Sequence, residues 1–136
     1  MQTIKALYKP RESVFSDTAR DDVLNLSDLI EGKIDADKFF AENFKTKGME
    51  LLLETAFKRF AGKSETGVIK LTQAMGGGKT HNMLALALLT QTPKWRKSFL
   101  GNGYDDIGEV KVVAFSGRET DYPYGIWGSI AEQLGP

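Results

Sequence analysis

The chain has 136 residues, of which 41% are hydrophobic and 26% are charged, and these are the proportions of an ordinary soluble protein with a buried core. Its 18 Lys and Arg residues balance 18 Asp and Glu residues, so no overall positive charge favours a nucleic acid or an anionic membrane as partner. The lack of cysteine excludes disulfides, thiolate metal sites and cysteine nucleophiles.

The N-terminus lacks the apolar core and the small-residue cleavage site of a signal peptide. The longest apolar run, from Met83 to Leu89, is far shorter than the roughly 20 residues that a membrane helix needs. We therefore expect a cytoplasmic protein without a membrane partner.

Residues 1–66 are predicted to form an N-terminal helical segment. Apolar residues recur at helical spacing between residues 20 and 31, and Gly32 follows as a stop signal. Asp35 predicts the cap of a short second helix, and Thr46 predicts the cap of a third. The expected packing residues of these two helices are Phe39, Phe40, Met49, Leu52, Leu53, Ala56, Phe57 and Phe60.

The pattern changes after residue 66, and residues 67–136 are predicted to be the first part of a nucleotide-binding domain. Residues 68–72, "VIKLT", are short, β-branched and bounded by turn residues, which predicts a strand. A glycine run follows directly. Residues 81–90, "HNMLALALLT", are apolar almost all round and predict a buried helix that ends before Pro93.

The remaining segments predict one more strand and one more helix. Residues 94–109 mix charge, aromatics and glycine without a period, and we interpret them as an excursion between elements. Residues 110–115, "VKVVAF", predict a strand of a parallel sheet covered on both faces. Pro123 can open a last helix. Its inward-facing residues are expected to be Ile126, Trp127, Ile130, Ala131 and Leu134.

The expected fold class is therefore α/β: a P-loop NTPase-like unit of strand, loop and helix with a parallel sheet, preceded by the helical segment. Two strands are too few for the several-stranded sandwich of nucleotide-binding domains. We therefore expect the domain to be incomplete, with strands missing from the chain rather than from this interpretation.

The stretch "QAMGGGKTH", residues 73–81, carries the chemistry that the sequence predicts. Glycines at 76, 77 and 78 let the backbone curl so that several N–H groups converge on a phosphate, and the helix that starts there adds its positive dipole end. In the P-loop pattern the lysine, here Lys79, reaches the β- and γ-phosphates. The hydroxyl that follows, Thr80, ligates Mg²⁺. The predicted cofactors are ATP and Mg²⁺.

The match to G-x-x-x-x-G-K-[ST] is incomplete, because Gln73 stands where that pattern has its first glycine. Gln73 must leave the strand with the backbone angles of an ordinary residue, which is feasible. The alternative interpretation is a glycine turn whose lysine is merely solvated.

Several side chains near the loop are weaker candidates. His81, the only histidine, can approach the nucleotide, although packing or capping is the more typical role of a histidine there. Asn82 is a similar candidate near the phosphates. The absence of a second histidine argues against a metal site of the histidine type.

No carboxylate follows the apolar strand in the way that a P-loop hydrolase uses to hold Mg²⁺ and to activate water. Ser116 and Gly117 come next, and then Arg118, which can touch a phosphate or a neighbouring subunit's nucleotide. Glu119 and Asp121 lie just beyond, where a solvated role is the more typical one. Arg118 and Glu119 stay weak catalytic candidates beside His81.

The stretch "PKWRKSF" has the basic and aromatic mixture of a single-strand nucleic-acid binder around Trp95 and Phe99. It is one such patch in a chain whose charges balance.

The sequence resembles a family of large prokaryotic predicted P-loop ATPases of the AAA+ superfamily. That family is grouped as a domain of unknown function and is often met beside anti-phage defence or DNA-modification genes. The resemblance rests on "LTQAMGGGKTHNMLALALL", on the upstream "FFAENFKTKGMELLL" and on "YGIWGSIAEQLG", which together extend over most of the chain. The triple glycine followed by Lys-Thr-His is its specific part.

The resemblance implies that Lys79 and Thr80 are ligands of nucleotide and Mg²⁺. It also implies that the chain is the N-terminal piece of a longer ATPase, and it transfers no Walker B carboxylate, sensor or arginine finger. In the full-length protein it implies that ATP hydrolysis remodels a protein partner or DNA, and assembly into an oligomer is compatible with that role. For this chain alone we expect weak nucleotide binding and little turnover.

Two rival functions stay open at the level of the sequence. A small phosphotransferase of the nucleoside-kinase type shares the loop but needs arginines and a lid around a second substrate. A non-catalytic interaction module would use the glycine loop only as a structural turn.

Overall fold

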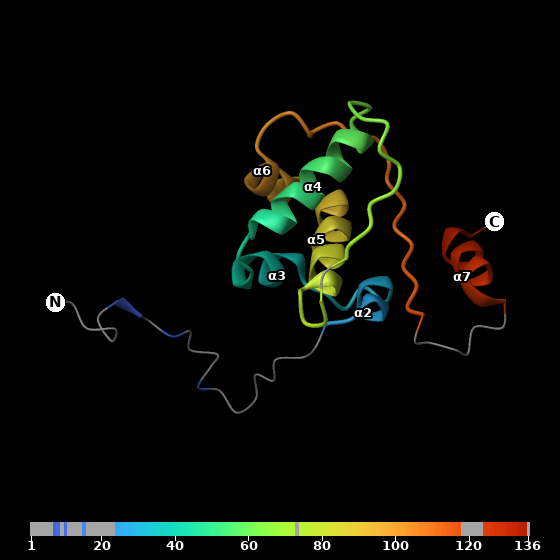
Figure 1. Ribbon diagram of the computed structural model, residues 1–136, viewed down its shortest axis with the longest axis horizontal. Coiled ribbons are helices and arrows are strands. Elements are labelled where there is room, and N and C mark those ends of the chain that lie inside the picture. Colours follow the sequence, from blue (N-terminus) through green and yellow to red (C-terminus); the bar gives the residue numbers. More distant parts are fainter. Residues whose placement is uncertain are drawn as a thin grey trace.

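The computed structural model describes residues 24–72, 74–117 and 124–135, together with the isolated residues 7, 8, 10 and 15. Within the three continuous ranges the chain forms six helices and no strand or sheet. Figure 1 shows helix α5 (Lys79–Gln91) at the centre of the bundle, with α2 (Leu26–Ile30), α3 (Ala36–Glu42), α4 (Lys47–Phe60) and α6 (Pro93–Leu100) around it and α7 (Gly125–Leu134) to the right. No helix in these ranges is long and apolar enough to cross a membrane.

Helices α3 and α4 begin where the sequence predicts their caps, whereas α2 begins at Leu26, inside the helix expected over residues 20–31. Helix α2 is Leu26–Ile30, helix α3 is Ala36–Glu42 and helix α4 is Lys47–Phe60. The side chain of Asp35 accepts a hydrogen bond from the Lys38 N–H, and Thr46 accepts one from the Met49 N–H. Both predicted caps are confirmed, because each side chain satisfies a backbone donor in the first helical turn.

Helix α5, Lys79–Gln91, is the buried helix that the sequence predicts, and it begins two residues earlier than expected. It packs against α2, α4 and α6. The core combines residues of α3, α4, α5 and the loop after α6: Phe39, Phe40, Met49, Leu53, Phe57, Leu84, Ala85, Leu88, Leu89 and Ile107. The N-terminal helices and α5 therefore share one core, although the predicted boundary between residues 66 and 67 stays a prediction.

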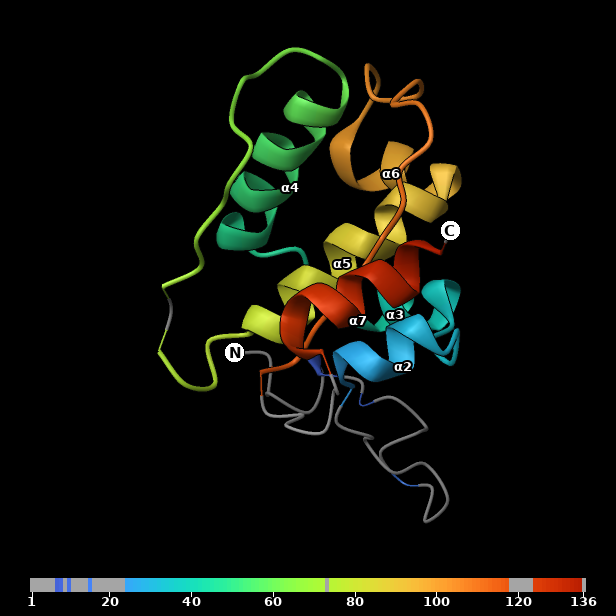
Figure 2. The same ribbon diagram turned by 90° about the vertical axis from the view of Figure 1, so that its right-hand side faces the viewer.

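The predicted α/β fold class is wrong for the part of the chain that the structure describes. Residues 68–72 and 110–115 run as irregular chain, not as strands. Figure 2 shows the first stretch descending beside α4 and the second running from the side of α6 toward α7. β-Branched residues favour a strand only when neighbouring strands pair with the backbone. The two stretches do not pair with each other, and Val68 is 86% exposed.

Residues 94–100, which the sequence predicts to belong to an irregular excursion over residues 94–109, instead form helix α6, Pro93–Leu100, together with Pro93. Pro93 starts this helix, where its missing N–H is harmless. Trp95 and Phe99, four residues apart, both pack against the ring of Phe40. Their spacing is the signal that the interpretation as an excursion overlooked.

Arg96 of α6 is 5% exposed. Within the described part of the chain, its hydrogen bonds go to backbone carbonyls. Its guanidinium binds the carbonyls of Leu89 and Thr90 at the C-terminal end of α5, both at 3.0 Å. It also donates to the carbonyls of Tyr104 and Asp105, at 3.1 and 3.3 Å. Because the end of a helix carries carbonyls without helical partners and a partial negative charge, this arginine caps α5 and fixes the following loop.

Helix α7, Gly125–Leu134, forms close to the predicted position, but its orientation differs from the prediction. Ile126 and Trp127 are exposed, as are Ala131 and Leu134, whereas Ser129 is buried. Pro123, the predicted first residue, lies outside the described residues. The side-chain amide of Gln133 donates to the Ala114 carbonyl at 2.8 Å and accepts from the Ala114 N–H at 2.9 Å. A side chain of α7 thus provides both hydrogen bonds that a neighbouring strand would have provided.

Candidate nucleotide site at the start of helix α5

The glycine loop leads directly into α5, and two of its glycines have backbone conformations that other residues rarely adopt. Gly76 has a φ of 77°, and Gly78, the residue that precedes the helix, has a φ of 72°. A Cβ at either position would meet no atom within 4 Å. The conformation, and not a lack of space, is therefore what requires glycine at these two positions.

Two hydrogen bonds of the glycine loop share one acceptor, the carbonyl oxygen of Ala74. The Gly77 N–H donates to this oxygen at 3.0 Å, and the Nζ of Lys79 donates to it at 2.8 Å. Lys79 is half-buried, whereas residues 74–78 and Thr80 are exposed. The lysine therefore extends back across the loop, and its ammonium lies beside the backbone that precedes the glycines.

Among the residues that the structure describes, no side chain caps the start of α5. The side chains of Asn25, Asp35 and Thr46 cap α2, α3 and α4, whereas glycine at position 78 has no side chain to offer. The first hydrogen bond of the helix runs from the Asn82 N–H to the Gly78 carbonyl at 2.9 Å. The N-terminal end of α5 therefore presents backbone N–H donors and the positive end of the helix dipole to the exposed loop. This arrangement suits an anion.

Thr80 is the second residue of α5, and its side chain is exposed beside the loop. No group of three or more His, Cys, Asp and Glu side chains in the described ranges could hold a metal ion. A hard cation such as Mg²⁺ is commonly held by one or two protein oxygens together with water and substrate phosphates. The Thr80 hydroxyl is the protein oxygen that this loop offers for that role.

His81 faces α3. Its ring stacks on Phe39 with 4.7 Å between the ring centroids, and its Nε2 forms a short hydrogen bond with Oδ1 of Asn43. Burial lowers the pKa of His81 below its ordinary value of 6.5, which keeps the ring neutral at neutral pH. The packing role that the sequence favours for His81 agrees with these contacts, and its assignment as a nucleotide ligand stays a prediction.

Of the other predicted candidates, the structure describes only Asn82. Asn82 is 6% exposed and lies in the buried part of α5. Gln73, Arg118, Glu119 and Asp121 lie outside the described residues.

The predicted nucleic-acid patch does not form an open aromatic surface. Trp95 and Phe99 pack against the core through Phe40, and Arg96 is buried. Of the basic residues of α6, Lys94 and Lys97 remain at the surface. Lys94 contacts Asp37 at 3.4 Å. Base stacking would need aromatic faces that are free, and these two rings already have partners.

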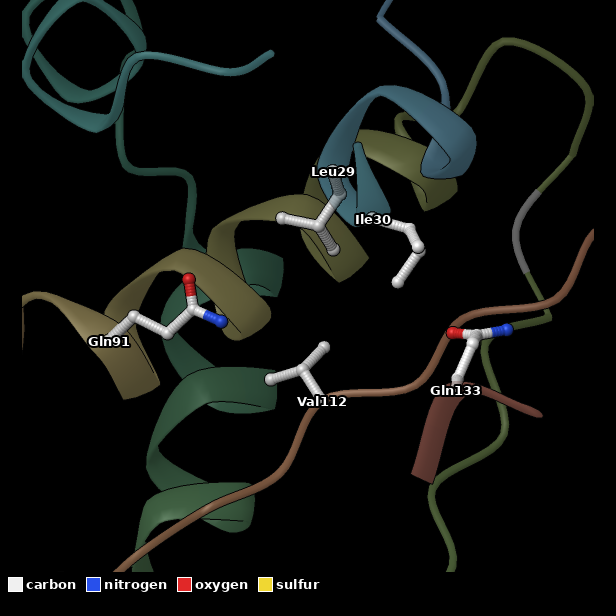
Figure 3. A pocket seen from close by; sticks show the side chains of 5 residues that line it. All are labelled: Leu29, Ile30, Gln91, Val112 and Gln133. Atoms are coloured by element: carbon white, nitrogen blue, oxygen red, sulfur yellow. The ribbon is translucent and has the colours of Figure 1, made fainter. Parts of the chain in front are cut away.

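A pocket of about 210 Å³ lies beside α5 and has Gln91, the last residue of this helix, in its lining. Figure 3 shows Leu29 and Ile30 of α2, Gln91, Val112 and Gln133 around it. Helix α5 rises about 1.5 Å per residue, so Gln91 lies roughly 18 Å from Lys79. None of these five lining residues belongs to the glycine loop, and none carries a cationic side chain for a phosphate.

Sequence reasoning missed two partners of the site, Phe39 and Asn43. Both belong to the end of α3, and Asn43 is 38 residues from His81 in the chain. The sequence does show the apolar pair Phe39 and Phe40 and a polar residue where the helix ends. It contains no signal that would have joined Asn43 to His81.

Comparison with known proteins finds a matching domain family. Residues 4–110 match the DUF499 N-terminal domain, which covers most of the chain and includes the glycine loop, α5 and α6. No curated protein and no solved structure matches the chain significantly. The chain belongs to the DUF499 N-terminal domain family.

Proposed function

We propose that residues 74–80 bind the phosphates of ATP together with Mg²⁺, and that the chain is the N-terminal part of a larger AAA+-like ATPase that remodels a protein partner or DNA. The observation that best supports this is the hydrogen bond of 2.8 Å from the Lys79 Nζ to the Ala74 carbonyl. It places a cation over a glycine loop whose next residues open a helix, so a phosphate there would meet the ammonium and backbone donors together.

Phosphate binding would exchange partners within the loop. The Lys79 ammonium would leave the neutral Ala74 carbonyl and donate to a charged phosphate oxygen, which is the stronger hydrogen bond. Backbone N–H groups of the glycine loop would face the same phosphates, and the Thr80 hydroxyl would ligate Mg²⁺. Bound Mg²⁺ would neutralise charge between the β- and γ-phosphates.

Turnover needs groups that the described residues do not bring to the loop. A hydrolase must position the attacking water and stabilise charge in the transition state. Arg118 and Glu119 stay candidates for these two tasks. We therefore propose weak binding and little hydrolysis by this chain alone, with the missing carboxylates supplied elsewhere in a longer protein.

Thermal melting with and without millimolar Mg-ATP, Mg-ADP and Mg-GTP tests the binding proposal. A ligand present at about a hundred times its dissociation constant stabilises the native state by roughly 2.7 kcal/mol, which raises the melting temperature of a domain of this size by several degrees. The Lys79→Ala variant should lose this shift. Lys97→Ala, which removes an exposed lysine of α6, is the matched control and should keep it.

A melting temperature that does not respond to any of the three nucleotides would overturn the proposal for this chain and favour a purely structural glycine turn. Acceptor screening with nucleosides would separate an ATPase from a phosphotransferase. Saturating Mg-ATP turnover that disappears in Lys79→Ala would contradict the expectation of little hydrolysis.

A further inference from the structure

His81 joins the first turn of α5 to the end of α3. It is the third residue of α5, two positions after Lys79. One face of its ring stacks on Phe39, with an angle of 27° between the ring planes, and its Nε2 contacts Oδ1 of Asn43. A polar contact and an apolar contact therefore restrain the same side chain from the same neighbouring helix.

The hydrogen bonds of Asn43 fix which ring nitrogen of His81 carries its proton. The Nδ2 of Asn43 donates to the carbonyl of Phe39 at 2.5 Å, so the amide oxygen is the atom that faces the histidine. An oxygen can only accept, and Nε2 of His81 must therefore be the donor. The bond has a single direction, from α5 to α3.

Asn43 also belongs to the end of α3 itself. It is the residue that follows the last helical position, Glu42, and its side chain satisfies the carbonyl of Phe39 in the final turn. The same amide thus ends α3 and holds His81. A rotation of α5 about its axis, which would re-aim the loop, would break the contact with Asn43 and unstack the ring from Phe39.

We propose that His81 is a positioning residue: its hydrogen bond to Asn43 and its stacking on Phe39 hold the first turn of α5 in the orientation in which the glycine loop binds phosphate. The inference rests on the proposed function. Binding at the loop and the ordering of α3 are then coupled, and the coupling acts in both directions. Nucleotide should therefore protect the end of α3, although no residue of α3 touches the nucleotide in this arrangement.

Three variants of the whole chain test the proposal. His81→Phe keeps a ring on Phe39 and removes the donor to Asn43. His81→Gln supplies an N–H donor from a side chain of similar reach and is the rescue variant. Thr46→Ala removes the cap of α4, so it lowers the stability of the protein without touching the contact, and it serves as the control for destabilisation.

Two measurements are made on each variant: amide hydrogen exchange of residues 36–43 and 75–82 without nucleotide, and the dissociation constant of Mg-ATP. In His81→Phe we expect faster exchange in both segments and an affinity weaker by about fivefold or more, the usual lower range for coupled sites. His81→Gln should restore both quantities toward the wild-type values. Thr46→Ala should leave the affinity unchanged. In the wild type, Mg-ATP should slow the exchange of residues 36–43.

Unchanged exchange in His81→Phe would overturn the proposal, because the contact would then hold nothing in place. Faster exchange with an unchanged dissociation constant would overturn it as well, since the contact would be structural only. Both of these results leave the proposed function intact. A wild type that does not bind Mg-ATP would overturn the proposed function, and the positioning role with it.

Discussion

The Nε of Arg96 donates to the carbonyl oxygen of Leu89 at 3.0 Å, in a chain where this guanidinium is almost completely buried. It has four carbonyl partners, two on α5 and two in the loop after α6. A planar group with five donors suits this arrangement, whereas a lysine ammonium does not reproduce the fork. The buried charge is tolerated because the guanidinium supplies hydrogen-bond donors to carbonyls that have no helical partner at the C-terminal end of α5.

We expect Arg96→Met to lower the free energy of unfolding by about 2–4 kcal/mol, because it fills the same space and leaves several carbonyls without a donor. Arg96→Lys should cost less, since part of the hydrogen bonding survives. Urea titration measures both. Lys97→Met, at an exposed neighbouring position, should change stability by only about 0.5 kcal/mol, and a similar loss in both methionine variants would contradict the assigned role.

Gly78→Ala should destabilise the chain by about 1–2 kcal/mol, since the left-handed backbone at this position brings a Cβ close to the neighbouring carbonyl. The loop would also lose its shape, so the nucleotide-dependent rise in melting temperature should disappear. Gly67→Ala is the matched control, because a Cβ there meets open space and its φ is not in the positive range. It should be neutral or slightly stabilising, and equal losses in the two variants would argue against a special conformation at Gly78.

His81 should make stability depend on pH in a known direction. Burial lowers its pKa in the folded state below 6.5, so the unfolded chain binds the proton more readily. This contribution to stability is fully present above pH 6.5 and is lost as the pH falls toward the folded pKa. His81→Gln should therefore lose less stability than the wild type between about pH 7.5 and about pH 5.5, as measured by thermal melting.

The wild type and His81→Gln share every other titrating group, so the difference between their stability profiles reports on His81. The chain has no second histidine. Hydrogen bonds from Trp95 and then Lys94 lower the pKa of Asp37 below its ordinary value of 3.8. Its titration therefore changes the stability only at a pH below 3.8, outside the range compared here. Identical pH dependence of wild type and His81→Gln would show that the ring is not buried in solution.

Gln133→Glu should release α7 while leaving the helical bundle stable. The substitution removes the donor to the Ala114 carbonyl and places a carboxylate beside that oxygen. We expect faster amide exchange in residues 125–134 and little change in the midpoint of the main unfolding transition. Exchange at the wild-type rate would mean that other contacts, such as the burial of Ser129, hold this helix.

The sequence predicts those features that depend on neighbouring residues. Asp35 and Thr46 cap helices because the donors they satisfy lie three residues further along. The glycines at 76 and 78 indicate a tight loop because their conformation is local. The apolar residues of α5 predict that this helix is buried, because they surround it on almost all sides and leave it no polar face for solvent.

Features that depend on distant partners could not be predicted in this way. Residues 110–115 have the composition of a strand, but pairing needs a neighbouring backbone, and here the amide of Gln133 pairs with Ala114. The contact between His81 and Asn43 is equally non-local. The role of Arg96 could not be predicted either, because nothing nearby in the sequence shows that four carbonyls converge on it.

The chain contains two tryptophans in very different surroundings. Trp95 packs against Phe40 with 5.4 Å between the ring centroids, whereas Trp127 on α7 is 79% exposed. Their fluorescence can therefore be separated: an aqueous quencher such as acrylamide will reach Trp127 first, and unfolding of the bundle will mainly shift the emission of Trp95. In Trp127→Phe the remaining indole reports on the contact between α3 and α6, so the opening of the bundle can be followed without any added label.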